Sequence, residues 1–319
     1  MPNELIVKEI HDLAAKLRNN IQKVIVGKDE VIDLITTSLI CSGHVLLEDI
    51  PGTGKTVLAK ALAKSIHSDF NRIQFTPDLL PSDLTGLNYF NQKLNEFQFK
   101  KGPLMNQIIL ADEINRATPR TQSSLLEAME EHQITVDGVT HTLEEPFFVL
   151  ATQNPIEIGG TFPLPEAQLD RFFMQLSMGY PTREEAHFIL TRFRQENPFD
   201  ALESVLTGAD IIEARKKYTS VYIDDTIISY ILDIVEKTRL HSDIELGISP
   251  RGSMALFKGA QAYAAVKGRT YVLPDDIKCL VKPIFSHRIK LKDAYTTTPS
   301  DVLQKILDSV TVPVEKMEG

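Results

Sequence analysis

A short glycine-containing segment limits what this chain can fold into more than any other part of the sequence. It follows an apolar run at residues 44–48 and precedes an amphipathic segment that starts at Val57. In such a position glycines let backbone amides curl around phosphate oxygens, and the helix N-terminus adds a positive dipole. A lysine neutralises phosphate charge and a threonine hydroxyl can bind Mg²⁺. The sequence therefore predicts a phosphate-binding loop made of Pro51, Gly52, Thr53, Gly54, Lys55 and Thr56.

Apolar runs of strand length recur through the first 180 residues and alternate with segments of helical spacing. This alternation is typical of βαβ units, so we expect an α/β fold with a five-stranded parallel sheet. The pair Asp137-Gly138 adds a tight hairpin within 133–142, because both residues tolerate a positive φ. The strands of the sheet are predicted at 44–48, 72–76, 107–111, 146–152 and 172–177.

The pattern changes beyond Pro181, where amphipathic helical segments take over and the strand signal disappears. With 319 residues the chain is long enough for two domains, each with its own core. We therefore expect an α/β domain at 1–180 and a smaller all-α domain at 181–319.

The composition of the chain argues against some classes of binding partner. The chain has 34 Lys and Arg against 43 Asp and Glu, a net charge of −9. An acidic surface repels phosphate backbones and so argues against nucleic acid as a partner. No apolar run approaches the ~18 residues of a membrane span, and the N-terminus has no basic and apolar leader pattern, so we expect a cytoplasmic protein without a membrane span. The cysteines, Cys41 and Cys279, are far apart in the sequence and are expected to be buried.

A second motif follows the strand predicted at 107–111, where apolar residues lead to Asp112 and Glu113. Open α/β sheets bind ligands at the carboxyl ends of their strands. Asp112 can hold a metal through its water shell, and Glu113 can polarise an attacking water, which fits hydrolysis. Alone, an acidic pair at a strand end is more often a helix cap or a solvated turn. The upstream phosphate-binding loop favours the hydrolytic interpretation.

The order and spacing of six segments resemble an AAA+ ATPase, and within that class the MoxR family. The resemblance covers nearly the whole chain, and Asp49, where the general loop pattern G-x-x-x-x-G-K-[ST] has a glycine, agrees with it. It implies that a Walker A loop at 51–56 and the Walker B residue Asp112 bind ATP and Mg²⁺, with Thr56 and Asp112 as metal ligands. The matching segments are 46–56, 74–83, 112–117, 151–155, 164–172 and 249–251.

The resemblance assigns catalytic roles to three further residues. Asn154 would be sensor 1, which places the hydrolytic water together with Glu113, although by itself it is equally well a turn-forming residue before a proline. Arg171 would be an arginine finger that enters the site of a neighbouring subunit. Arg251 would be sensor 2, which contacts the nucleotide from the lid. Without the family, both arginines are ordinary surface residues.

Three more segments have counterparts in the family. Val26 and Gly27 resemble the segment that lies along the adenine, although a buried turn is an equally good interpretation. Residues 133–142 resemble the pre-sensor 1 hairpin and 86–102 the helix-2 insert, both of which would project toward a central pore or a partner. Without the family they are a surface hairpin and a loop.

The resemblance further implies an oligomeric chaperone that remodels or activates a client protein. The oligomer would be a ring of six subunits, and a client with a von Willebrand factor A domain is one candidate. Loss of the γ-phosphate would drive motion between core and lid. Two alternatives stay open: a nucleic-acid-dependent motor, which the acidic balance disfavours, and a nucleotide-gated binding module with little turnover, which the full set of predicted catalytic residues disfavours.

Overall fold

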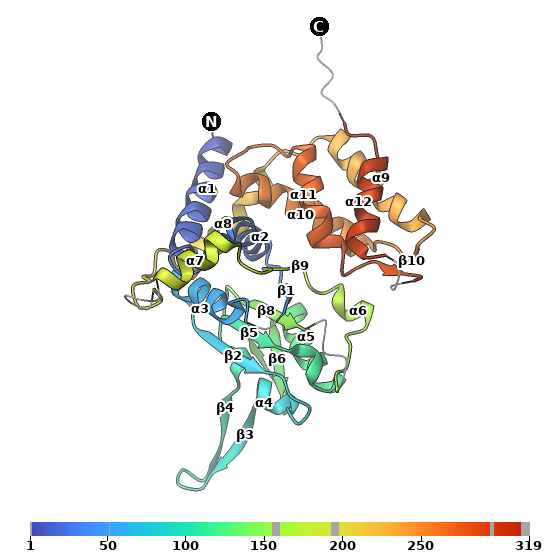
Figure 1. Ribbon diagram of the computed structural model, residues 1–319. Coiled ribbons are helices and arrows are strands. Elements are labelled where there is room, and N and C mark those ends of the chain that lie inside the picture. The colour runs from blue at the N-terminus through green and yellow to red at the C-terminus, as the bar shows by residue number, and fades with distance from the viewer. Residues whose placement is uncertain (1, 51, 155–159, 193–197, 294–296, 314–319) are drawn as a thin grey trace.

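A computed structural model describes residues 2–50, 52–154, 160–192, 198–293 and 297–313 (Figure 1). Its centre is a five-stranded sheet in the order β2-β5-β8-β1-β9, and all four strand pairings are parallel. This confirms the predicted α/β fold. The strands are β1 (Val45–Glu48), β2 (Phe70–Gln74), β5 (Ile108–Asp112), β8 (Phe148–Gln153) and β9 (Met174–Leu176).

All five strands differ by one or two residues from their predicted bounds, and for β2 and β9 the strand pairing and the hydrogen bonds give the reason. β2 begins two residues early because Phe70 pairs with Ile108 at the start of β5. β9 is shorter than predicted, and the carbonyl groups just before it bond to side chains instead of to a strand. The carbonyl of Phe172 accepts from His287 Nε2 at 3.0 Å, and that of Phe173 accepts from Arg288 Nη1 at 3.1 Å.

Both faces of the sheet are covered, as expected for parallel strands with near-continuous apolar sequence. Val45 and Leu47 of β1 face a core shared with the N-terminal helices and most of the C-terminal helices. Leu46, between them, faces a second core formed with α5. The helices that complete these layers are α1 (Pro2–Ile21), α2 (Asp29–Ile40), α3 (Lys55–Ser65), α4 (Pro81–Thr85), α5 (Pro119–Glu131) and α6 (Glu166–Leu169).

The C-terminal part is mainly helical but also contains a small sheet that the sequence analysis did not predict. Strands β10 (Ile244–Leu246) and β11 (Lys290–Leu291) pair in antiparallel fashion between the helices. None of the described helices is both long and apolar enough to cross a membrane. The helices are α7 (Arg183–Arg192), α8 (Gly208–Lys217), α9 (Asp225–Leu240), α10 (Pro250–Val266), α11 (Pro274–Phe285) and α12 (Pro299–Ser309).

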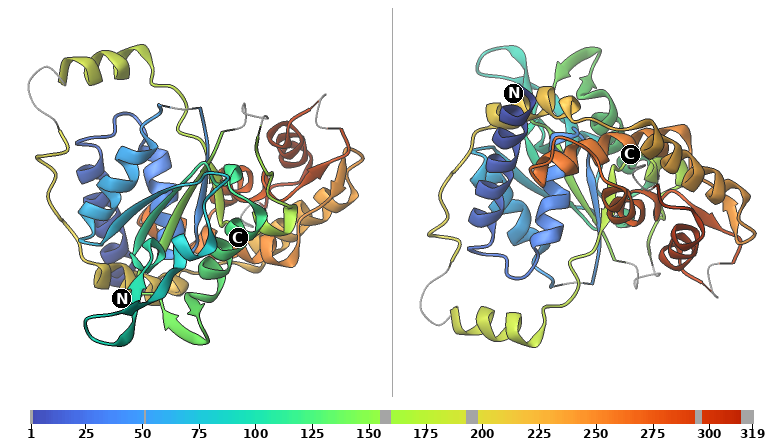
Figure 2. Two further views of the ribbon diagram at one scale, coloured as in Figure 1. Left: turned by 90° about the horizontal axis from the view of Figure 1, so that it is seen from below. Right: turned by 90° about the horizontal axis from the view of Figure 1, so that it is seen from above.

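Helix α7 differs from the other helices of this part. It lies at the periphery in both views of Figure 2, and none of its residues is buried. The helices that follow it pack on the shared core instead. The cysteines also differ from expectation, because both are only half-buried. Desolvation of Cys41 nevertheless raises the pKa of its thiol to about 12.

Two hairpins extend from the sheet on the side of α5. The first, β3 (Gly86–Asn91) and β4 (Glu96–Lys101), projects away from the body (Figure 1) and replaces the loop expected at 86–102. The second, β6 (Gln133–Val136) and β7 (Val139–Thr142), turns at 137–138, where both residues have the expected positive φ. The two hairpins touch: Phe99 stacks on His141 with ring centroids 4.3 Å apart.

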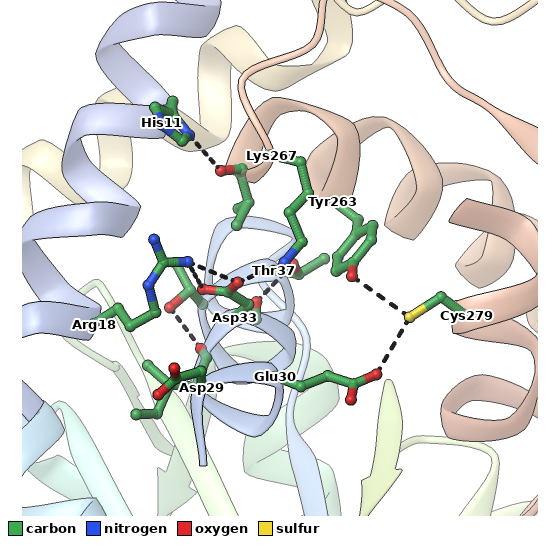
Figure 3. Close-up of polar contacts among 12 residues, drawn as sticks. His11, Arg18, Asp29, Glu30, Asp33, Thr37, Tyr263, Lys267 and Cys279 are labelled. Carbon is green, nitrogen blue, oxygen red and sulfur yellow. Dashed lines mark hydrogen bonds and ion pairs between the residues drawn. The ribbon is translucent and has the colours of Figure 1, made fainter. Parts of the chain in front are cut away.

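A buried carboxylate joins α10 to the N-terminal helices (Figure 3). The side chain of Asp33, on α2, is 2% exposed. Arg18 of α1 donates to both of its oxygens at 2.8 Å, and Lys267, just after α10, donates to Oδ2 at 2.8 Å. A buried charge needs such partners, because desolvation without them is strongly unfavourable. The C-terminal end of α10 is thereby fixed to the α/β part.

Candidate active site

The predicted phosphate-binding loop connects the end of β1 to the start of α3. Gly52 and Gly54 have φ values of 85° and 91°, a region that favours glycine. The space where a side chain on Gly52 would stand is empty to at least 4 Å. The amine of Lys55 donates to the backbone carbonyl of Asp49 at 3.0 Å. Gly52 to Gly54 therefore form an open turn that leads into α3, whose first two residues are Lys55 and Thr56, while Pro51 lies outside the described residues.

Asp49 has a structural role that explains why it replaces the first glycine of the general pattern. Its side chain is buried and accepts three hydrogen bonds from the segment after β9. The donors are the backbone N–H of Met178 at 2.5 Å, the N–H of Gly179 at 3.2 Å and the Ser177 hydroxyl at 3.1 Å. The loop is thus fastened to the neighbouring edge strand.

The carboxylate of Asp112, at the end of β5, is oriented from both sides. The hydroxyl of Thr152, on β8, donates to its Oδ1 at 2.7 Å. The guanidinium of Arg72, on β2, donates to its Oδ2 at 2.5 Å. Thr152 also accepts the backbone N–H of Glu113 at 2.8 Å, so one hydroxyl aligns both acidic residues.

Glu113 lies just beyond β5 in a left-handed conformation with φ 57° and ψ 49°. Its Oε2 accepts hydrogen bonds from Gln74 Nε2 at 2.7 Å and from Arg116 Nη1 at 3.0 Å. Asn154 follows the last residue of β8 and is buried. Because β5 and β8 are adjacent parallel strands, Glu113 and Asn154 leave the sheet at the same edge.

The predicted adenine segment lies beside the loop. The place that a side chain on Gly54 would take is 3.8 Å from Cδ1 of Ile25 and 4.0 Å from Cε of Met178. Gly27 has φ 71°, and the carboxyl group of Glu185, from α7, fills the position of its missing side chain. Ile25, directly before Val26 and Gly27, is therefore the residue of this segment that adjoins the loop, and α7 contacts the segment at Gly27.

The donor set fits a Mg²⁺ ion. Carboxylate and hydroxyl oxygens are the ligands that this hard cation prefers, and Asp112 and Thr56 supply one of each. Thr56 is in the first turn of α3, directly after the loop. In the described ranges no group of three His, Cys, Asp or Glu side chains could hold a metal by itself.

The two predicted arginines lie at the opposite end of the sheet. Arg171 precedes β9 and Arg251 is the second residue of α10, yet both form ion pairs with Glu130, near the end of α5. They line a cavity of about 430 Å³ together with Gly43 and His44, which precede β1. The loop follows the other end of β1, which spans ~13 Å. In the described chain Arg251 therefore lies at the other end of β1 from the loop, and its role as sensor 2 stays a prediction.

Two family models match this chain. One describes the ATPase family associated with various cellular activities (AAA) and matches residues 44–174, and the other describes an AAA lid domain and matches 236–306. Chaperone MoxR1 of Mycobacterium tuberculosis is 35% identical to the chain over 97% of its residues and 85% of the relative. The chain belongs to the MoxR family of AAA ATPases.

Two further proteins match the chain over nearly their whole length. The uncharacterised protein YeaC of Bacillus subtilis is 49% identical, covering 97% of this chain and 98% of that protein. The crystal structure of a protein described as a putative ATPase from Cytophaga hutchinsonii superimposes with a TM-score of 0.90 at 37% identity, covering 98% of both chains. The AAA lid model begins inside α9, and the division of this MoxR-family chain at residue 180 stays a prediction.

Sequence reasoning missed several residues that shape this MoxR-type site. Gln74 lies inside a matching segment, so its place at the end of a strand beside β5 was a usable signal. Asp49, Arg116 and Thr152 also lie inside matching segments, and Arg116 comes only three residues after its partner Glu113. No local pattern distinguishes the others, because each reaches the site from a distant element only through the fold. They are Arg72, Glu130, Met178 and Glu185.

Proposed function

We propose that this MoxR-family chain is a Mg²⁺-dependent ATP hydrolase whose site is completed by a neighbouring copy in a ring, which we expect to contain six subunits. The observation that supports this most directly is the separation of the loop from Arg171 and Arg251 by the length of β1. Since the loop and the two arginines of one chain lie at opposite ends of β1, we propose that the arginines of a second copy reach the phosphate held by the first copy's loop.

The loop would bind the nucleotide. The backbone amides of 52–56 and the N-terminus of α3 would hold the phosphates, and Lys55 would exchange the carbonyl of Asp49 for phosphate oxygens. Ile25, Val26 and Met178 would contact the base. Thr56 and Asp112 would hold Mg²⁺, which when bound screens the charge of the β- and γ-phosphates.

Hydrolysis would start from a water held by Glu113 and Asn154. Glu113 accepts a proton as the water oxygen attacks the γ-phosphorus, and the bond from that phosphorus to the β–γ bridging oxygen breaks, which leaves ADP and inorganic phosphate. The hydrogen bonds from Gln74 and Arg116 hold the Glu113 carboxylate at the carboxyl end of β5. Asp112 and Glu113 keep a fixed mutual orientation through Thr152.

The neighbouring copy would supply positive charge. Arg171 would act as the arginine finger, and Arg251, its neighbour at Glu130, would act with it on the same phosphate. An arginine finger is typically worth about 10³–10⁵ in rate. Turnover would consequently require assembly, and cleavage would change the contact between adjacent copies.

The energy would be used to remodel or activate a client protein in the cytoplasm. The relative named chaperone MoxR1 supports this role. A client with a von Willebrand factor A domain is the class that we propose to test first. The ATP-trapping variant Glu113→Gln, used as bait, should retain the client in the presence of ATP and release it in ADP. Equal recovery with both nucleotides would count against a nucleotide-driven remodelling cycle.

A mixing experiment tests the shared site. Lys55→Ala removes the loop's cation, and Arg171→Ala removes the neighbour's, so each variant alone should be inactive. Mixed oligomers should regain hydrolysis, because some interfaces combine an intact loop with an intact arginine. Native mass spectrometry would verify that mixed oligomers form. Mixed oligomers without any regained activity would contradict a site shared between copies.

A further inference from the structure

Glu130 is the acidic partner of both arginines at the amino end of the sheet. Its Oε2 lies 3.0 Å from Nε of Arg171, and its Oε1 pairs with Nη2 of Arg251. The side chains of Glu130, Arg171 and Arg251 are 33%, 31% and 49% exposed. All three therefore remain accessible to another molecule, although they contact one another in the single chain.

The backbones that carry the two arginines are held together without Glu130. The carboxylate of Asp170 accepts from Nε of Arg288 at 2.7 Å and from the hydroxyl of Ser249 at 3.1 Å. Ser249 is also the N-cap of α10, two residues before Arg251. Arg288 is almost fully buried and donates further to the carbonyls of 172 and 173. These contacts fix the backbone positions of Arg171 and Arg251, but they do not fix the directions of the two side chains.

Two guanidinium groups side by side repel each other, and long side chains with nothing to hold them lose their direction. A carboxylate between the two guanidinium groups offsets their repulsion and holds both side chains in one direction. The bond to Nε takes up one edge of the Arg171 guanidinium, so the edge formed by its two Nη groups remains for a second partner. A phosphate oxygen pair suits that edge, because guanidinium groups bind phosphate with two parallel hydrogen bonds.

We propose that Glu130 is a positioning residue for hydrolysis at the neighbouring subunit: it holds Arg171 and Arg251 as a pair whose free edges face the γ-phosphate of that subunit. This rests on the shared site proposed above. Glu130 touches no nucleotide and acts through the two arginines. Its loss should lower kcat about 10- to 100-fold, the effect of a small misplacement of a catalytic group. The KM for ATP should stay unchanged, since the loop of the other chain binds the nucleotide.

The test compares Glu130→Ala, Glu130→Gln and Glu130→Asp. Glu130→Gln keeps the shape but loses the charge, and should behave like Glu130→Ala, whereas Glu130→Asp keeps the charge and should recover part of kcat. Glu127→Ala is the matched control, because Glu127 lies one turn earlier on α5, is exposed and has no partner among the described residues. Exposed ion pairs contribute little to stability, so all four variants should unfold within about 3 °C of the wild type.

Mixing two variants in one oligomer tests whether Glu130 acts across the interface between two copies. Glu130→Ala mixed with Lys55→Ala should regain activity as Arg171→Ala does, because the intact loop of one variant meets the intact arginine pair of the other. Wild-type kcat in Glu130→Ala and Glu130→Gln would overturn the inference. So would a loss of activity that mixed oligomers do not restore, since Glu130 would then act within its own chain. If Arg171→Ala itself is not rescued, the shared site fails and the inference fails with it.

Discussion

The two ends of the central sheet hold opposite charges, and each end is neutralised from a distant element. At the carboxyl end, Asp112 and Glu113 are engaged by Arg72 and Arg116. At the amino end two arginines are engaged by one carboxylate. An isolated chain therefore satisfies each half of the site internally. Under the function proposed above, the carboxyl end would turn toward a nucleotide, and the amino end would present its arginine pair to a second copy of the chain.

The amino end should account for the largest loss of activity. Arg171→Ala is expected to lower kcat about 10³- to 10⁵-fold, or roughly 4–7 kcal/mol of barrier, because one of the cations that oppose the charge developing on the γ-phosphate is then missing. Nucleotide affinity, measured by titration calorimetry in the Glu113→Gln background, should hardly change. A loss of ATP binding as large as the loss of turnover would show that the two ends are not separate in function.

The carboxyl end should show a smaller but comparable effect. Glu113→Gln is expected to lower kcat about 10²- to 10⁴-fold, because the amide cannot accept the proton of the attacking water. Bound ATP should persist, and single-turnover kinetics with labelled nucleotide measures this directly. Thr152→Val, which leaves the carboxylate in place but removes its alignment, serves as the graded comparison. Turnover at the wild-type rate in the glutamine variant would remove Glu113 from its proposed role.

Asp33 should stabilise the packing of α10, the helix that carries Arg251, although it is far from both arginines in the sequence. Asp33→Ala leaves Arg18 and Lys267 without their shared counter-ion and should cost about 3 kcal/mol of unfolding free energy. Since α10 carries Arg251 at its other end, the variant should also lower kcat, with a smaller change in the KM for ATP. Urea denaturation gives the first quantity. Unchanged stability would mean that the cluster does not hold α10 in place.

The smallest expected effect of any single residue is a pH dependence of stability, to which two buried histidines contribute. Burial lowers the pKa of His44 to about 3 and also lowers the pKa of His287 well below its usual value. Both nitrogens of His44 are satisfied in the neutral ring, since Nδ1 accepts the N–H of Val149 and Nε2 donates to the carbonyl of Met129. Nε2 of His287 donates to the carbonyl of Phe172, while its buried Nδ1 has no hydrogen-bond partner among the described residues. As the pH falls below about 6.5, the ordinary pKa of histidine, these two rings take up protons in the unfolded chain but stay neutral in the folded chain.

Stability should accordingly be complete above pH ~6.5 and decline as the pH falls, by roughly 1.4 kcal/mol per pH unit for each histidine. Urea denaturation between pH 5 and 7.5 measures the slope. His44→Gln should reduce it by about half, whereas His187→Gln, at an exposed position on α7, should leave it unchanged. A slope that is the same in both variants would contradict the assignment to buried neutral rings.

Much of the carboxyl end could be predicted because it is encoded locally. Glycines, Lys55 and Thr56 follow one another directly, and Asp112-Glu113 directly follows an apolar strand. A parallel sheet brings the carboxyl ends of its strands to one edge, so short-range pattern and topology together place these residues. The partners Arg72, Thr152 and Glu185 have no such signal, because each depends on the register of a neighbouring strand or on the path of α7.

The amino acid sequence by itself determined the class of sheet, the loop before α3 and the acidic pair after β5, because strand alternation, glycine torsions and carboxylate chemistry act over a few residues. Only the tertiary structure decided that Arg171 and Arg251 meet at Glu130, at the end of the sheet away from their own loop. Their encounter depends on how α5, the start of β9 and α10 pack around buried Asp170 and Arg288 contacts. Long-range packing of this kind leaves no periodicity in the sequence.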